Sequence, residues 1–284
     1  MATWDPQQYE RFSDLRNRPF GDLIARVGAV APERVVDLGC GNGPLTLSLA
    51  DRWPRAQITG VDSSDSMLER AAALDVEHRV HWELADVNGW EPDSEPEVLV
   101  TNATLQWVPG HLTLIDRWLS RLPDGGWFAM QVPGNFDAPS HRIIREVARA
   151  HDRAADRAGV PAKYRSEERA ENFVGWLEGA LRDAPVESPE RYAEALAAHC
   201  GHVDVWETTY LQVLDPQGAQ RSPVLEWVKG TALRPLLDVL DDSERAALLE
   251  ELVTRFDVAY PRAPYGTPMP FRRIFAVGRK GASV

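Results

Sequence analysis

Residues 34–43 read RVVDLGCGNG, a short apolar run that ends in a glycine-rich turn. Leu45, Leu49 and Trp53 then recur at helical spacing up to Pro54. This order predicts a strand, a loop and a helix. Glycines in such a loop let the backbone approach a ligand, and the first amides of the helix face that ligand. We therefore expect a binding loop at residues 37–43.

The same alternation continues along the chain. Apolar or alternating runs predict strands at 57–62, 79–84, 97–102 and 125–132, and helical periodicity predicts helices at 64–74 and 111–122. Strands that alternate with helices of about a dozen residues indicate parallel pairing through right-handed crossovers, in an open doubly wound α/β sheet. Such sheets bind ligands at the carboxyl ends of their strands, near the point where the strand order reverses.

Composition limits the class of partner. The chain has 284 residues, and its 31 basic and 43 acidic residues give a net charge of −12. This balance disfavours nucleic acid, because phosphate binding needs clustered Lys and Arg. No apolar run approaches the roughly 20 residues of a membrane span, and the amino end lacks the pattern of a secretory signal. We expect a cytoplasmic protein without a membrane or nucleic-acid partner.

The cysteines and histidines predict no metal site. Cys40 and Cys200 lie in no C-x-x-C motif, and neither His78 with His81 nor the group at 199–202 has the setting of a metal cluster. A reducing compartment suits a chain with only two cysteines outside such motifs.

An acid after the second strand indicates a nucleoside. Asp62 ends that strand, 23 residues after Gly39, where a carboxylate accepts both hydroxyls of a ribose. Helix capping is the alternative role for Asp62, although Ser63 or Ser64 could supply the cap.

The glycine spacing argues against a dinucleotide. The loop reads G-x-G-x-G, whereas the dinucleotide fingerprint is G-x-G-x-x-G, which makes a dehydrogenase the weakest alternative. Asp37 would repel a pyrophosphate and suits a nucleoside that carries an amino acid. Asp86, after the third strand, can accept the exocyclic amine of adenine, and a plain turn residue is its alternative role.

Five segments are similar to the successive motifs of class I S-adenosylmethionine-dependent methyltransferases: VDLGCGNG, GVDSS, ADV, TNATLQWVP and PDGGW, all within residues 34–132. The chain also resembles the trans-aconitate 2-methyltransferase family almost from end to end. This second resemblance rests on the segments WDPQQYERFSDLRNRP, MQVPGNFDAPSH, DVWETTYLQVL, EWVKGTALRP and FRRIFAVGRK. A charged segment at 152–185 is longer than we expect in that family.

The resemblance implies a Rossmann-like sheet of seven strands, mostly parallel with an antiparallel last strand, and helical cap insertions. We expect an N-terminal helical segment over the cofactor cleft at 1–30, the cofactor-binding core at 31–138, a helical cap insertion at 139–188, and the end of the sheet at 189–284 with a helical substrate-side insertion at about 215–270. Within the first segment, Arg18 and Pro19 are expected to interrupt the helix.

The implied cofactor is S-adenosylmethionine, and the implied reaction gives S-adenosylhomocysteine and a monomethyl ester of trans-aconitate. The residues expected around the cofactor are Arg18, Asp37, Gly39, Gly41, Asn42, Gly43, Asp62, Ser63, Asp86, Val87 and Asn102.

Carboxylate methylation needs positioning rather than acid–base catalysis. A carboxylate is ionised at neutral pH, so it can attack the methyl group without a general base or a metal. A tricarboxylate does need a positive pocket in an acidic protein, and arginine binds carboxylates in two places. The residues expected to position it are Gln106, Trp107, Tyr9, His141, Tyr210, Arg234 and Arg272. Arg145 and Arg273 are expected to face solvent, and a core aromatic is the alternative role for Trp107.

Two further interpretations stay open. The first is a carboxyl methyltransferase that acts on another small acid or on a malonyl group carried by an acyl carrier protein. The second is a cofactor-binding regulator without turnover. The oligomeric state is also open, and a monomer fits the sequence.

Overall fold

The computed structural model describes residues 13–92, 94–158, 185–230, 232–237, 240 and 242–281. The chain forms two compact units. The core unit comprises residues 14–134, 185–208 and 272–284, and the helical unit comprises residues 1–13, 135–184 and 209–271. Each unit buries its own cluster of apolar side chains.

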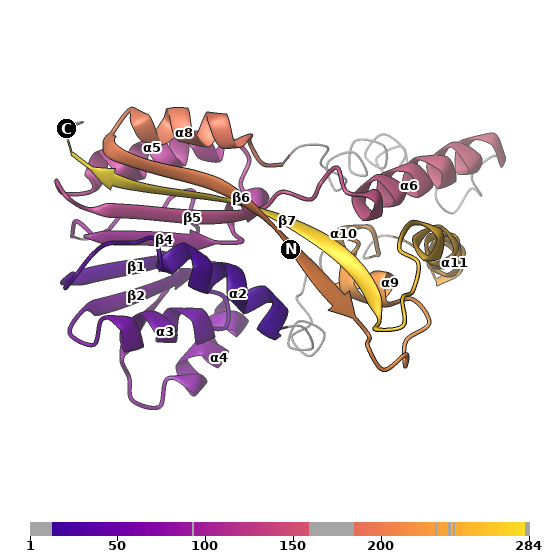
Figure 1. The fold of residues 1–284 in the computed structure, drawn as a ribbon, viewed down its shortest axis with the longest axis horizontal. Coiled ribbons are helices and arrows are strands. Elements are labelled where there is room, and N and C mark those ends of the chain that lie inside the picture. Colours follow the sequence, from indigo (N-terminus) through magenta and orange to yellow (C-terminus); the bar gives the residue numbers. More distant parts are fainter. Residues whose placement is uncertain are drawn as a thin grey trace. The chain divides into compact units, whose positions relative to one another are not determined.

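A seven-stranded sheet has the order β3-β2-β1-β4-β5-β7-β6 (Figure 1). Its strands are β1 (Arg34–Leu38), β2 (Gln57–Asp62), β3 (Val80–Leu84), β4 (Val98–Asn102), β5 (Trp127–Pro133), β6 (Cys200–Leu214) and β7 (Thr267–Lys280). The first five strands pair in parallel, and β7 pairs antiparallel with β5. The expected mostly parallel sheet with an antiparallel last strand is confirmed, and its order reverses between β1 and β4.

Helices cover both faces of the sheet in the core unit (Figure 1). On one face lie α5 (His111–Arg121) and α8 (Pro189–Ala197); on the other lie α2 (Ser13–Ile24), α3 (Pro44–Arg52) and α4 (Asp65–Leu74). Strand side chains alternate between the faces. Leu38, Leu99, Phe128 and Ile274 pack with Trp118 of α5 in one buried cluster. Their strand neighbours therefore point to the opposite face, which we call the α3 face.

Two elements differ from the sequence prediction. The helix α2 runs through Pro19 without a break, so the expected interruption is wrong. Phe20, directly after it, is buried, and this packing outweighs the hydrogen bond that proline removes. The strand β7 begins at Thr267, within the range expected for the helical insertion at about 215–270. Burial alternates through Met269 and Phe271, a pattern that the intervening prolines hide in the sequence.

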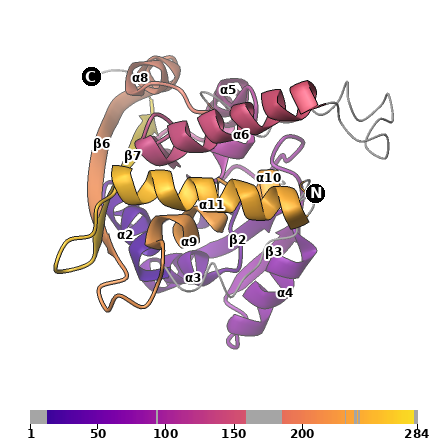
Figure 2. The same cartoon turned by 90° about the vertical axis from the view of Figure 1, so that its right-hand side faces the viewer.

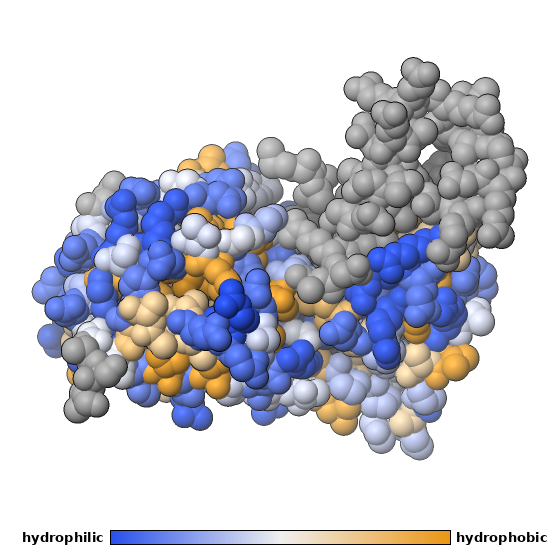
Figure 3. All heavy atoms as spheres, turned by 90° about the horizontal axis from the view of Figure 1, so that it is seen from above, coloured by the Kyte–Doolittle hydropathy of each residue, from blue (hydrophilic) through white to orange (hydrophobic). Residues whose placement is uncertain are grey.

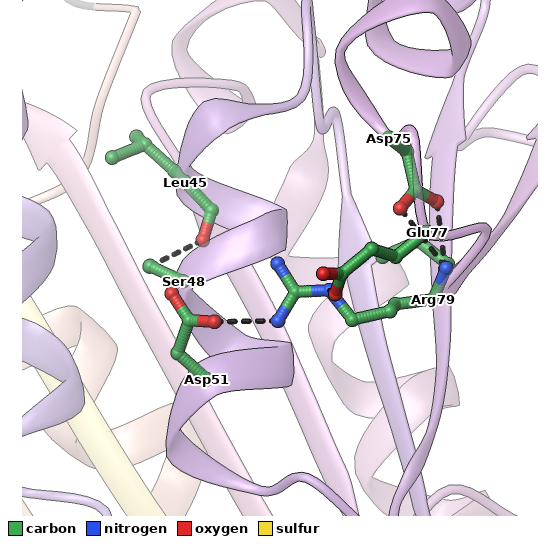
Figure 4. Close-up of polar contacts among 7 residues, drawn as sticks. Leu45, Ser48, Asp51, Asp75, Glu77 and Arg79 are labelled. Carbon is green, nitrogen blue, oxygen red and sulfur yellow. Dashed lines mark hydrogen bonds and ion pairs between the residues drawn. The ribbon is translucent and has the colours of Figure 1, made fainter.

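An acidic cap holds the turn between α4 and β3 (Figure 4). The buried Asp75 accepts the Arg79 amide at 2.9 Å and the Val80 amide at 2.9 Å, one on each carboxylate oxygen. The Arg79 side chain forms ion pairs with Asp51 of α3 and with Glu77. This cluster ties α3, the end of α4 and the start of β3 together.

The helical unit contains α6 (Pro139–Ala158), α9 (Pro223–Lys229), α10 (Arg234–Leu237) and α11 (Asp242–Ala259). The helices α6 and α11 pack side by side (Figure 2). Their shared cluster includes Val147, Trp227, Leu252 and Phe256. Most of the charged segment at 152–185 lies outside the described residues.

Within the described ranges, every helix is too short or too polar to span a membrane. Hydrophilic side chains are interspersed with apolar ones over the face that Figure 3 shows. In the same part of the chain, no three His, Cys, Asp or Glu side chains are grouped to hold a metal ion.

Candidate functional site

Three glycines shape the loop after β1. Gly39, Gly41 and Gly43 have φ angles of 78°, 57° and 92°, in the left-handed region that favours glycine. A Cβ on Gly39 would lie 2.0 Å from Thr104 Oγ1, and one on Gly43 would lie 2.8 Å from the Ala71 Cβ. A Cβ on Gly41 would meet no atom within 4 Å. Two glycines therefore close the loop against the fold, and Gly41 leaves its outer side open to a ligand.

Asp62 holds this loop to the start of α4. Its Oδ2 accepts the Gly41 amide at 2.9 Å, and its Oδ1 accepts the Ser64 amide at 2.9 Å. Each carboxylate oxygen can accept a further hydrogen bond, so the structural role leaves room for two ribose hydroxyls. Ser63 is exposed next to Asp62, and Asn42 is half-buried in the loop.

Asp37 is buried near the end of β1. Its Oδ2 accepts the Thr46 hydroxyl at 2.6 Å. Burial raises the pKa of Asp37 to about 6; the Thr46 hydrogen bond opposes this rise, and the nearby Asp62 charge adds to it. A cation bound beside Asp37 would favour its charged form. The site therefore suits a positively charged ligand group.

Asp86 and Val87 follow β3. The exposed Asp86 accepts the backbone amide of Asn88 at 2.9 Å and its side-chain amide at 2.8 Å, as a turn residue does. Val87 is buried in the core cluster. Because Leu84 pairs with Asp62, this turn lies one strand away from Asp62 at the same edge of the sheet.

Amide side chains and an indole follow β4. Asn102 ends the strand, and its buried Oδ1 has no hydrogen-bond partner within the described part of the chain. Gln106 lies buried in a short helix, Leu105–Trp107, and its Nε2 donates to the Ala103 carbonyl at 2.6 Å. Trp107 is 43% exposed, which excludes a role as a core aromatic.

The arginines differ from the sequence prediction. Arg145 in α6 and Arg273 in β7 are 9% and 6% exposed, so the expectation that both face solvent is wrong. The Arg272 side chain is instead 41% exposed and is paired with Glu207. Neighbouring residues in a strand point to opposite faces, and only the register of β7 against β5 decides which of the two arginines turns inward.

Two of the residues that are expected to position the substrate lie in the helical unit, and the structure describes their side chains. His141 is half-buried and lies 3.2 Å from Ser140 Oγ through its Nδ1. Burial and the Arg145 charge lower the pKa of His141 to about 4, so its imidazole is neutral at pH 7. Tyr210 of β6 is buried.

Three other expected residues are less closely defined. Arg18 is exposed on α2, with its Nε 3.9 Å from Asp22. Arg234 begins α10, but its side chain lies outside the described residues, as does the whole of Tyr9.

Sequence reasoning missed three residues at this edge. Thr46 binds Asp37, and Thr104 packs against Gly39. Gln131 of β5 is buried on the α3 face. Thr46 and Gln131 had a signal, because each is a polar residue in a predicted buried helix or strand. No sequence signal points to Thr104, because Gly39, the residue that it packs against, is far away in sequence.

Comparison with known proteins gives a consistent result. A family model described as a methyltransferase domain matches residues 9–180. The chain is 47% identical over 287 residues to a trans-aconitate 2-methyltransferase of Streptomyces coelicolor, covering 98% of this chain and 87% of the relative. It is 45% identical over 279 residues to a trans-aconitate 2-methyltransferase of Rhodococcus jostii, covering 97% of this chain and 99% of the relative.

The fold also resembles a solved structure, phosphoethanolamine N-methyltransferase 2 of Haemonchus contortus in complex with phosphomonomethylethanolamine and S-adenosylhomocysteine. The TM-score is 0.50 at 15% identity, over 93% of this chain and 53% of that chain. At this identity the likeness concerns the fold alone.

Proposed function

We propose that this chain, which belongs to the trans-aconitate 2-methyltransferase family, transfers a methyl group from S-adenosylmethionine to one carboxylate of trans-aconitate. The products are a monomethyl ester and S-adenosylhomocysteine. The observation that carries the proposal is the open side of Gly41 beside Asp37 and Asp62, at the reversal of strand order. The identity to named enzymes along nearly the whole chain supports the choice of substrate.

The residues at this edge fit the cofactor. When bound, S-adenosylmethionine supplies an electrophilic methyl group on a sulfonium. The buried Asp37 matches the cationic methionine part, Asp62 the ribose hydroxyls, and the turn at Asp86 the adenine amine. The residues proposed to hold the cofactor are Arg18, Asp37, Gly39, Gly41, Asn42, Gly43, Asp62, Ser63, Asp86, Val87 and Asn102.

The residues of this chain orient the substrate and exclude water. The acceptor carboxylate is already ionised, so no side chain has to remove a proton. Holding the reacting atoms about 3 to 3.5 Å apart is worth roughly 7 to 11 kcal/mol in favourable cases. His141 is neutral and offers hydrogen bonds rather than charge. The residues proposed to position the substrate are Gln106, Trp107, Tyr9, His141, Tyr210, Arg234 and Arg272.

We propose that the partner of this protein is a small tricarboxylate and that the protein binds neither nucleic acid nor a membrane. The proposed compartment is the cytoplasm. Cys40 and Cys200 are free and buried, which fits a reducing compartment. The net charge of −12 opposes binding to a polyanion.

A methyl-transfer assay tests the proposal. The purified protein is offered S-adenosylmethionine with a panel of di- and tricarboxylic acids and, separately, a malonyl thioester of an acyl carrier protein, and each ester is identified by mass. We expect trans-aconitate to have the highest kcat/KM. Transfer only to the carrier-protein thioester would contradict this substrate. Cofactor binding without transfer to any acceptor would assign a regulator instead.

The variant Asp62→Ala tests the cofactor site independently of the substrate. Loss of the carboxylate should weaken S-adenosylmethionine binding by roughly 1 to 3 kcal/mol, measured by calorimetric titration. Unchanged affinity would remove Asp62 from the ribose site.

A further inference from the structure

The carboxyl edge of the sheet changes in chemical character from strand to strand. On the α3 face, β2 and β1 carry Asp62 and Asp37, β4 and β5 carry Asn102 and Gln131, and β7 carries Arg273. The edge thus runs from acids through neutral amides to a guanidinium.

The strand register places the donor end of this row on one face. Asn102 lies opposite Gln131, and Pro133 lies opposite Arg273. Ile274, the neighbour of Arg273, packs in the cluster beneath α5 and α8. Because strand side chains alternate, Arg273 points to the α3 face, as Gln131 does.

Gln131 carries a buried side-chain amide. Its side chain is 1% exposed, and neither Nε2 nor Oε1 has a hydrogen-bond partner in the part of the chain that the structure describes. Native folds pair such groups, because an unpaired buried amide is destabilising. The Asn102 Oδ1 on the adjacent strand is unpaired in the same way. Two orphaned amides side by side indicate a place for a polar ligand.

Arg273 brings a positive charge to the same region. It is 6% exposed, and burial strengthens the attraction of a guanidinium for an anion. Its planar fork matches the two oxygens of a carboxylate. The amide nitrogen of Gln131 adds a neutral donor one strand away.

We infer that Gln131 and Arg273 bind a carboxylate of the substrate other than the one that is methylated. The inference rests on the proposed function, which supplies the tricarboxylate. Asp37 on β1 and Gln131 on β5 are separated by two strand spacings, about 10 Å. A cationic cofactor at the acidic end and an anionic substrate at the basic end would therefore meet between them, above β4.

The test compares Arg273→Met, Gln131→Leu, Arg279→Met and Arg272→Met with the wild type, all in the full chain. Titration of the S-adenosylhomocysteine complex with trans-aconitate gives Kd, and turnover gives KM. We expect Arg273→Met to raise both about 100-fold and Gln131→Leu about 10-fold, with cofactor affinity within twofold of the wild type. Arg279→Met is the matched control, because Arg279 is exposed on the same strand and face at the opposite end of the sheet. It should leave both constants unchanged.

Stability separates binding from a structural role. Gln131→Leu replaces an unsatisfied amide with an apolar group of similar size, so its urea midpoint should equal or exceed that of the wild type. A structural residue would lose stability on the same change. If Arg273→Met does not fold, the Kd and KM of Gln131→Leu still test the inference.

Substrates that lack one carboxylate identify the bound group. Itaconate, glutaconate and mesaconate each correspond to trans-aconitate without one of its three carboxylates. The acid that lacks the bound carboxylate should have the same Kd in the wild type and in Arg273→Met. The other two should lose affinity in the variant.

The outcomes keep the two proposals apart. If the wild type methylates trans-aconitate while Arg273→Met and Gln131→Leu keep its KM within twofold, the inference is overturned and the proposed function stands. A KM for trans-aconitate that rises in Arg272→Met but not in Arg273→Met would also overturn the inference. If the wild type transfers no methyl group to trans-aconitate, the proposed function fails, and the Kd titration alone decides whether these residues bind the acid.

Discussion

Asp37 is placed where its charge weakens the unliganded fold. Its pKa of about 6 in the folded chain lies above the value of 3.8 expected for the unfolded chain. Between pH 4 and 6 the unfolded chain therefore loses this proton first, and stability falls as the pH rises. Above pH 6 the loss amounts to about 2 to 3 kcal/mol. The charge of Asp37 therefore favours the binding of a cation and lowers the stability of the protein without a ligand.

Asp37→Asn should reverse this balance. The amide oxygen can still accept the Thr46 hydroxyl, and the buried charge is gone. We expect the free energy of unfolding at pH 7.5 to rise by about 2 kcal/mol, with a gain that shrinks as the pH falls from 6 to 4. Binding of S-adenosylmethionine should weaken at the same time. Urea unfolding and calorimetric titration measure the two effects, and a variant that binds as tightly as the wild type would contradict the role of Asp37.

The loop glycines should respond differently to the same substitution. Gly39→Ala combines a left-handed φ with a clash against Thr104, so it should lower the free energy of unfolding by about 2 to 4 kcal/mol. Gly41→Ala meets no atom of the fold and should lose about 1 kcal/mol. Its methyl group would occupy the ligand side, so its Kd for S-adenosylmethionine should rise about tenfold or more. Normal cofactor binding by Gly41→Ala would place the ligand elsewhere.

At the scale of elements, packing and capping decide where helices and strands end. The helix α2 passes through Pro19 because the side chains after it are buried. The start of β3 depends on Asp75, which replaces the carbonyl partners that the amides of Arg79 and Val80 would otherwise need. Both effects act through contacts rather than through intrinsic propensity.

Asp75→Ala should destabilise the chain through this cap. It leaves the buried amide of Val80 and the partly buried amide of Arg79 without an acceptor, so we expect a loss of about 2 to 3 kcal/mol in urea unfolding. Asp51→Ala removes only the exposed ion pair to Arg79 and should cost less than about 1 kcal/mol. Equal losses in the two variants would show that Arg79, rather than Asp75, holds the turn.

For the molecule as a whole, negative and positive side chains lie on different strands at the carboxyl edge of the sheet. Acids lie on β1 and β2, and the buried arginine lies on β7. A cofactor cation and a substrate anion would each meet the opposite sign, although the chain as a whole carries −12. Under the proposed function, the local placement of charged side chains, rather than the net charge of the chain, governs recognition.

The pH profile reports on the whole reaction. Without a general base, kcat should be nearly constant from about pH 6 upward, and kcat/KM for S-adenosylmethionine should fall below pH 6 as Asp37 becomes protonated. Asp37→Asn should abolish that fall. Initial rates between pH 5 and 9, with trans-aconitate saturating, measure both. A steep rise in kcat between pH 6 and 8 would require a general base and contradict direct attack.

Local sequence patterns were enough to predict the class of the sheet and the edge of the sheet at which the cofactor is proposed to bind. Alternating strands and helices, the glycines after β1 and the acid after β2 are local patterns, because each reflects backbone conformation or periodicity within a few residues. The resemblance in motifs then led to the family. These features survive in the structure with small changes at element ends.

The other side chains at this edge depend on contacts between residues that are far apart in sequence, so local patterns could not predict them. The burial of Arg273 rather than Arg272 follows from its register with Pro133, a partner far away in sequence. The same holds for the contact of Thr46 with Asp37 and for the buried amide of Gln131, which has no partner among the described residues. A shift of one residue in a strand turns every side chain to the other face, and nothing in the local pattern fixes that register across distant strands.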